Sequence, residues 1–100
     1  MTEIKYNLKV TSYCIEETIK REIIHTINQE RKKLGISIKD FCDVELFSDD
    51  FEVKDVGEIS KKTLSNIRIE KNKGKEFMFY IVDEGIKTYY KFNLSIKLIN

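Results

Sequence analysis

Histidine and cysteine are scarce in this chain, and most nucleophilic sites and many metal sites depend on them. Its 100 residues include one histidine, His25, and two cysteines, Cys14 and Cys42, whose separation fits no metal or redox motif. The four glycines are isolated, so the chain has neither a P-loop nor a dinucleotide-binding fingerprint. We therefore expect no catalytic residue, no cofactor, no metal site and two reduced, partly buried thiols.

Long apolar runs and an excess of charge of one sign are also absent. No stretch approaches the roughly 20 apolar residues that a membrane helix requires, and residues 1–5 lack the apolar region of a signal peptide. The net charge is only +1, so contact with nucleic acid would need a local basic patch. With 41% hydrophobic and 35% charged residues, we expect a single folded domain over residues 1–100, located in the cytoplasm.

Hydrophobic periodicity predicts two helices and two strands in the first two thirds of the chain. Residues 3–10 alternate between apolar and polar, as in a half-buried strand. Isoleucines recur every four residues over ~13–34, which indicates an amphipathic helix that Gly35 ends. Alternation returns over ~40–48, and ~52–64 has the pattern of a weaker helix.

The remaining third predicts three strands. Ile67 and Ile69 lie in the first, residues 77–82 form the second after a turn at Gly74, and ~86–99 form the last after a hairpin loop at 83–85. Helices with one apolar face must bury it on a sheet. The order β-α-β-α-β-β-β therefore predicts an α/β (α+β) fold: a two-layer sandwich with a mixed sheet of about five strands and two helices.

Two groups of cationic side chains are candidates for contact with RNA. The first lies on the outer side of the long helix and at its end: Arg21, Arg31, Lys32 and Lys33. The second surrounds Gly74 and precedes the aromatic residues Phe77, Phe79 and Tyr80: Arg68, Lys71, Lys73 and Lys75. Long cationic side chains bind phosphates, and aromatic rings stack on unpaired bases. The alternatives are an ordinary solvated helix face and lysines that protect a hairpin edge above core aromatics.

Two other residues of the long helix are singled out by their positions. Glu30 falls in the apolar stripe between Ile27 and Leu34, so we expect it either at the rim of the core or beside a Lys, Arg or Tyr. A buried Glu30 would have a raised pKa. His25 falls opposite the isoleucines and is expected in solvent.

The long helix also carries a resemblance to a known family. Residues 21–36 (REIIHTINQERKKLGI), then Asp40 and the strand residues 44–46, resemble the C-terminal region of isoleucyl-tRNA synthetase of the eukaryotic/archaeal-like type. The flanking strand 3–10, the stretch 59–64 and the closing hairpin follow the order of that region. The chain departs from the pattern where the family has paired arginines, here His25 and Thr26, and an apolar residue, here Glu30.

The resemblance implies a non-catalytic accessory domain that helps to bind and position tRNA(Ile) for aminoacylation by the rest of the synthetase. Neither ATP-handling motif of that enzyme is present. Its implied partners are the anticodon arm of tRNA(Ile) and the remainder of the synthetase, with no membrane and no metal. One alternative is a protein-interaction module with an exposed apolar patch through Phe41, Phe47 or Tyr89. Another is a small enzyme, which would need a pocket with converging polar groups at His25 or Cys42.

Overall fold

A computed structural model describes residues 12–37 and 39–98. In chain order its elements are α1 (Ser12–Lys33), β1 (Cys42–Phe47), α2 (Val56–Thr63), β2 (Ser65–Ile69), β3 (Lys75–Asp83) and β4 (Ile86–Leu98). The predicted α+β class with two helices and a mixed sheet is confirmed, and the described residues form a sheet of four strands rather than five. The strand predicted over residues 3–10 lies outside the described residues.

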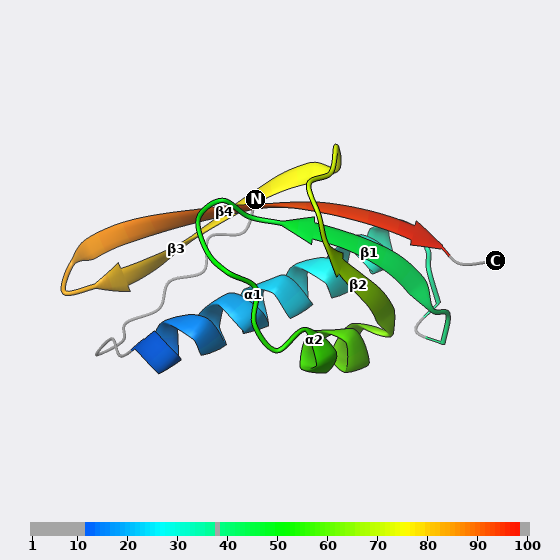
Figure 1. The fold of residues 1–100 in the computed structure, drawn as a ribbon, viewed down its shortest axis with the longest axis horizontal. Helices are drawn as coiled ribbons and strands as arrows, with labels where there is room; N and C mark the ends of the chain where they lie inside the picture. Colours follow the sequence, from blue (N-terminus) through cyan, green and yellow to red (C-terminus); the bar gives the residue numbers. More distant parts are fainter. Residues whose placement is uncertain (1–11, 38, 99–100) are drawn as a thin grey trace.

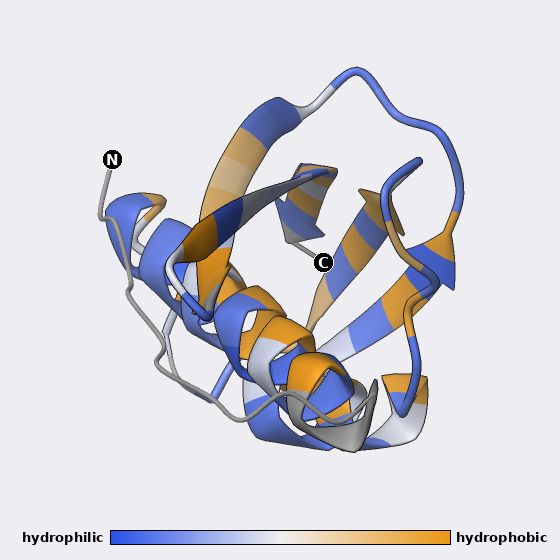
Figure 2. Cartoon of the chain, turned by 90° about the vertical axis from the view of Figure 1, so that its left-hand side faces the viewer, coloured by the Kyte–Doolittle hydropathy of each residue, from blue (hydrophilic) through white to orange (hydrophobic). Residues whose placement is uncertain are grey.

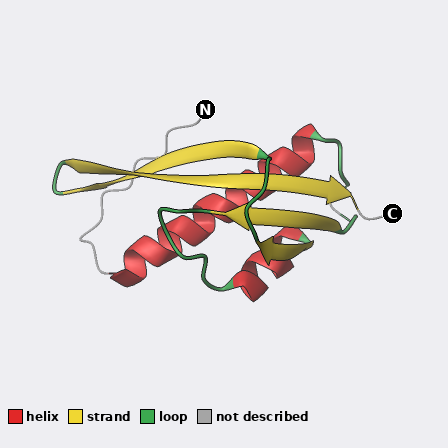
Figure 3. Ribbon diagram, turned by 45° about the horizontal axis from the view of Figure 1, so that its top comes forward, coloured by secondary structure: helices red, strands yellow, loops and turns green. Residues whose placement is uncertain are grey.

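The sheet has the order β2-β1-β4-β3 (Figures 1 and 3). β1 and β2 are parallel and joined through α2, whereas β4 runs antiparallel to both β1 and β3. The hairpin between β3 and β4 turns through Glu84 and Gly85, whose φ values of 50° and 81° are both left-handed. Such a turn matches the twist of the flanking strands, and the predicted glycine takes the conformation expected of it.

Both helices lie on the same side of the sheet, and the core fills the space between the two layers (Figure 1). Ile19, Ile23 and Ile27 of α1 are buried against Val44 and Phe92 of the sheet. The apolar stripe of α1 and the alternation along the strands can be followed in Figure 2. Across the part of the chain that the structure describes, neither helix combines the length and the apolar character that crossing a membrane requires.

The end of α1 follows the predicted glycine signal. Gly35 has a φ of 72°, its N–H donates to the main-chain oxygen of Lys32, and the N–H of Ile36 donates to that of Arg31. This pair of bonds is a Schellman motif. Leu34 was expected to extend the buried stripe, but it lies just beyond the end of α1 at Lys33 and is 61% exposed.

The second helix is shorter than the predicted ~52–64. Asp55, with a φ of 55°, stands immediately before α2 in a left-handed conformation that cannot continue a helix backwards along the chain. Phe51 and Val53 instead pack against the core from an irregular segment. Val53 was expected on the apolar face of this helix, but it reaches the core without helical structure.

Candidate functional site

Arg31, a predicted phosphate contact, is buried in the structure. Its side chain is directed inward at the end of α1, and the residue is 5% exposed. One terminal nitrogen donates to the main-chain oxygens of Thr63 and Leu64, and the other to those of Ser37 and Asp40, at 2.8 and 2.6 Å. The guanidinium therefore joins α1 to the end of α2 and to the loop before β1. Arg31 is not one of the exposed cations that could contact RNA.

Lys33 and Lys75, one from each predicted basic group, meet at Glu30. The carboxylate of Glu30 lies 3.3 Å from Lys33 Nζ and 3.0 Å from Lys75 Nζ, and the residue is 7% exposed. The expectation of a lysine partner is met, and the rim alternative is wrong. Burial alone would raise the pKa of Glu30, but the two lysines outweigh it and hold that pKa below its usual value. The expected raised pKa is therefore wrong as well.

The other predicted basic residues are exposed but do not form one cluster. Arg21 and Lys32 stand on α1. Arg68 lies on β2 beside Glu45 of β1, and Lys71 and Lys73 follow in the connection to β3. Arg68 and Lys71 thus lie on the sheet face that carries Phe47, whereas Lys75 and Lys33 meet at Glu30 on the helix side. Arg21 belongs to neither group.

The aromatic residues predicted beside this group belong mainly to the core. Phe79 and Tyr80 are buried, and the half-buried Phe77 packs against the core, so the core alternative is correct. A different aromatic ring, that of Phe47, lies beside the basic group. Lys71 Nζ lies 5.6 Å from the ring centroid of the half-buried Phe47, at cation–π distance.

The pairing of Phe47 with Lys71 was missed because it depends on topology. Alternation along β1 correctly places Phe47 on the face opposite the core. Only the parallel pairing of β1 with β2 brings the residues that follow β2 to the end of β1. A helix between two strands allows them to pair in parallel, as α2 does for β1 and β2. That parallel pairing, had it been recognised, would have predicted the contact.

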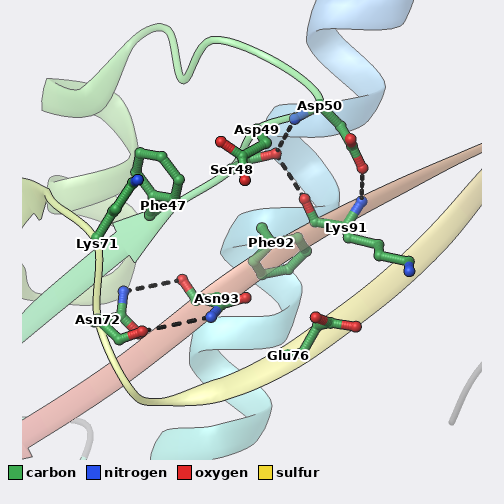
Figure 4. A pocket seen from close by; sticks show the side chains of 10 residues that line it. All are labelled: Phe47, Ser48, Asp49, Asp50, Lys71, Asn72, Glu76, Lys91, Phe92 and Asn93. Atoms are coloured by element: carbon green, nitrogen blue, oxygen red, sulfur yellow. Dashed lines mark hydrogen bonds between the residues drawn. The ribbon is translucent and has the colours of Figure 1, made fainter.

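A polar pocket of about 360 Å3 opens beside Phe47 (Figure 4). On one side the turn after β1 is fixed to β4. The hydroxyl of Ser48 donates to the main-chain oxygen of Lys91 at 2.6 Å and accepts the N–H of Asp50 at 3.0 Å. Asp50 in turn accepts the N–H of Lys91 at 2.8 Å, so the Asp50 carboxylate is already hydrogen-bonded within the wall.

On the other side, Asn72 builds the wall of the pocket. Its amide nitrogen donates to the main-chain oxygens of Glu45, at 3.2 Å, and Asn93, at 3.4 Å, and its side-chain oxygen accepts the N–H of Gly74 at 3.0 Å. Asn93 returns a bond to the main-chain oxygen of Asn72 at 3.4 Å (Figure 4). The connection carrying Lys71 and its neighbours is therefore held against β4.

A second cleft, of about 210 Å3, lies between α1 and β3 and includes His25 and Glu22. His25 is exposed as predicted, whereas Glu22 is 6% exposed and its buried Oε2 has no hydrogen-bond partner. Burial raises the pKa of Glu22, and the electrostatic effect of the nearby His25 acts in the opposite direction.

Cys42 is buried and forms no disulfide, and its burial raises the thiol pKa, which disfavours the reactive thiolate. Within residues 12–37 and 39–98, no three His, Cys, Asp or Glu side chains gather as a metal site would require.

The chain matches no family model, no curated protein and no solved structure. The fold and the site therefore define only a class: a small α+β domain with a cation-flanked aromatic ring beside a polar pocket.

Proposed function

We propose that this domain is a non-catalytic, RNA-binding accessory domain similar to the C-terminal domain of isoleucyl-tRNA synthetase. It assists the binding and positioning of tRNA(Ile) through the anticodon arm and works in the cytoplasm with the remainder of the synthetase. The observation that carries the proposal is the cation–π contact between Lys71 and Phe47 at the edge of the polar pocket. An unpaired base can stack on such a ring while the lysine moves to a phosphate.

Different residues around Phe47 would contact the base and the phosphate backbone of a bound RNA. Three carboxylates, those of Asp49, Asp50 and Glu76, line the pocket, so it suits a base with an amino group rather than a phosphate. Two further exposed cations are available to the phosphate backbone: Arg68 on β2 pairs with Glu45, on the same sheet face as Phe47, and Lys73 follows Asn72 in the connection to β3. Lys75 and Lys33 pair with Glu30 of α1, on the helix side of the sheet, and would contact the RNA only beyond the edge of the sheet.

A protein-interaction module without RNA contact is the second candidate. Several large apolar side chains favour it, since Leu34 is 61%, Phe41 44% and Tyr89 49% exposed. Two of the three residues expected in such a patch, Phe41 and Tyr89, are thus exposed, whereas Phe47 is half-buried. This candidate predicts that the chain does not bind tRNA(Ile) even at low salt.

Titration of the full chain with a tRNA(Ile) transcript, followed by fluorescence anisotropy over a range of salt, distinguishes the two candidates. The RNA proposal expects binding that weakens steeply as salt rises, because bound cations displace counterions. Phe47→Leu keeps an apolar side chain but removes the ring, and should weaken binding about tenfold, the value of one stacked base. Lys71→Glu should weaken it at least as much and flatten the salt dependence.

The matched control is Lys97→Glu, which makes the same charge change on β4 beside Asp43, outside the proposed set. It should weaken binding far less than Lys71→Glu. Undetectable binding at low salt, or equal effects of the two reversals together with an unaffected Phe47→Leu, rules out the proposed surface.

A further inference from the structure

A groove of about 500 Å3 lies between the C-terminal parts of α1 and α2, away from Phe47. We call it the α1–α2 groove and define it by six lining residues: Asn28, Arg31, Lys32, Ile36, Lys62 and Leu64. Its volume falls within the range of binding clefts for small molecules and peptide side chains, about 300–1,000 Å3. Its shape is fixed, because Arg31 bonds both to the end of α2 and to the loop after α1.

Ile36 and Leu64 give the groove an apolar surface. Leu64 ends α2 with φ 48° and ψ 56°, a left-handed conformation in which glycine is the usual residue. A residue with a Cβ is unfavourable in this conformation. Burial of the Leu64 side chain does not offset that cost, since the residue is 37% exposed. Unfavourable backbone geometry that leaves an apolar side chain at the surface of a cleft favours a role in binding.

The charged residues of the groove are all cationic. Arg31, Lys32 and Lys62 line it, and no acidic residue does. Among the described ion pairs none involves Arg31, whose hydrogen bonds go to main-chain oxygens. Lys62 lies 3.5 Å from Glu58, but both side chains are largely exposed, and an exposed pair of this kind contributes little. The groove therefore combines apolar surface with positive charge that no carboxylate within it balances.

We propose that the α1–α2 groove docks an acidic peptide segment of a partner protein. The segment inserts aliphatic side chains between Ile36 and Leu64 and places its carboxylates beside Lys32 and Lys62. The amide of Asn28, at the rim, is available to hydrogen-bond the peptide main chain. A peptide fits better than RNA because the lining contains no aromatic ring on which a base could stack. This site is separate from the Phe47 pocket and does not depend on the proposed RNA contact.

The test is a nuclear magnetic resonance titration of the 15N-labelled full chain with a short synthetic peptide. The peptide carries two leucines one helical turn apart among glutamates, and a matched peptide has glutamine in place of each glutamate. We expect amide shifts concentrated at Asn28, Ile36 and Leu64. The glutamate peptide should bind on the order of tenfold more tightly than the glutamine peptide, as expected for complementary charge.

Two variants and one control connect the binding to the groove. The double change Lys32→Glu with Lys62→Glu should abolish the preference for the glutamate peptide. Leu64→Asn should weaken both peptides, and it preserves the fold because asparagine tolerates the left-handed conformation. Lys97→Glu, on the other face of the sheet, should change neither affinity.

Three results overturn the proposal. The first is the absence of amide shifts in the groove at millimolar peptide. The second is a peptide affinity that the double lysine reversal leaves unchanged. The third is a set of groove shifts produced by a single-stranded RNA oligonucleotide and not by the peptide, which would assign this surface to RNA.

Discussion

The guanidinium of Arg31 donates a hydrogen bond to the main-chain oxygen of Thr63, which joins the last turn of α1 to the last turn of α2. A helix end leaves main-chain oxygens without partners, and a cation is favoured there by the helix dipole. Arg31 satisfies oxygens at the end of α2 and in the loop before β1 at the same time. The guanidinium of Arg31 therefore stabilises the fold, although its sequence context suggested a contact with RNA at the surface.

Arg31→Met should destabilise the domain by about 3 kcal/mol or more, since it leaves several buried oxygens without a donor. Urea unfolding followed by circular dichroism measures the free energy of unfolding. The neighbouring Lys32→Met removes an exposed cation and should stay within about 0.5 kcal/mol of the wild type. Equal stability of the two variants would show that Arg31 does not hold these segments together.

Glu30→Gln should lower the free energy of unfolding by about 1 kcal/mol near neutral pH. The effect is this small because solvent around the two exposed lysines weakens their attraction to the carboxylate. Because Lys75 and Lys33 outweigh burial and lower the folded-state pKa of Glu30, ionised Glu30 stabilises the fold above its unfolded pKa of about 4.3. That contribution is lost as the pH falls through the folded-state pKa. Urea unfolding at a series of pH values should show wild type and variant converging in acid, and a constant difference would contradict the pairing.

Glu22→Gln should have the opposite effect and stabilise the domain at neutral pH. Burial raises the pKa of Glu22 above the unfolded value, so ionised Glu22 destabilises the fold at high pH, and the penalty disappears below the unfolded pKa. The variant should melt at a higher temperature than the wild type near pH 8 and at the same temperature near pH 4. Glu70→Gln, at an exposed site, serves as the control, and a destabilised Glu22→Gln would point to a partner for this carboxylate.

The elements that depend on local pattern could be predicted from the sequence. The isoleucine spacing of α1 with Gly35 at its end, and the loop with Gly85 between β3 and β4, each carry their signal within a few residues. The α2 boundary could not be predicted, because the left-handed conformation of Asp55 leaves no trace in hydrophobic periodicity.

The candidate site depended on contacts between distant segments. Helical spacing identified Glu30 as an acid within an apolar stripe, but one of its two lysines comes from the same helix and the other from the start of β3. Arg31 has the sequence context of a solvated cation, and only the position of Thr63 and Asp40 shows why it is buried. Side chains whose partners are main-chain oxygens of other segments carry no compositional signal.

Gly74→Ala should disrupt the connection that carries the proposed RNA contacts. A Cβ at Gly74 would overlap the main-chain oxygen of Leu94, which belongs to the central strand β4 and cannot move away without breaking the sheet. We expect a loss of about 3 kcal/mol or more, as for other severe backbone clashes. The asparagine side chain at position 72, whose oxygen would be 2.9 Å away, could move, whereas the strand could not.

The matched substitution is Gly57→Ala within α2, where a Cβ would meet nothing within 4 Å. It should stabilise the domain by about 0.5–1 kcal/mol, because alanine is a better helix former and restricts the unfolded chain. Comparison of the two variants by urea unfolding separates a steric requirement for glycine from its general conformational cost. Failure of Gly74→Ala to fold on expression, while Gly57→Ala folds, would be the strongest form of the expected result. A Gly74 variant as stable as its Gly57 counterpart would mean that residues 72–75 do not lie against β4.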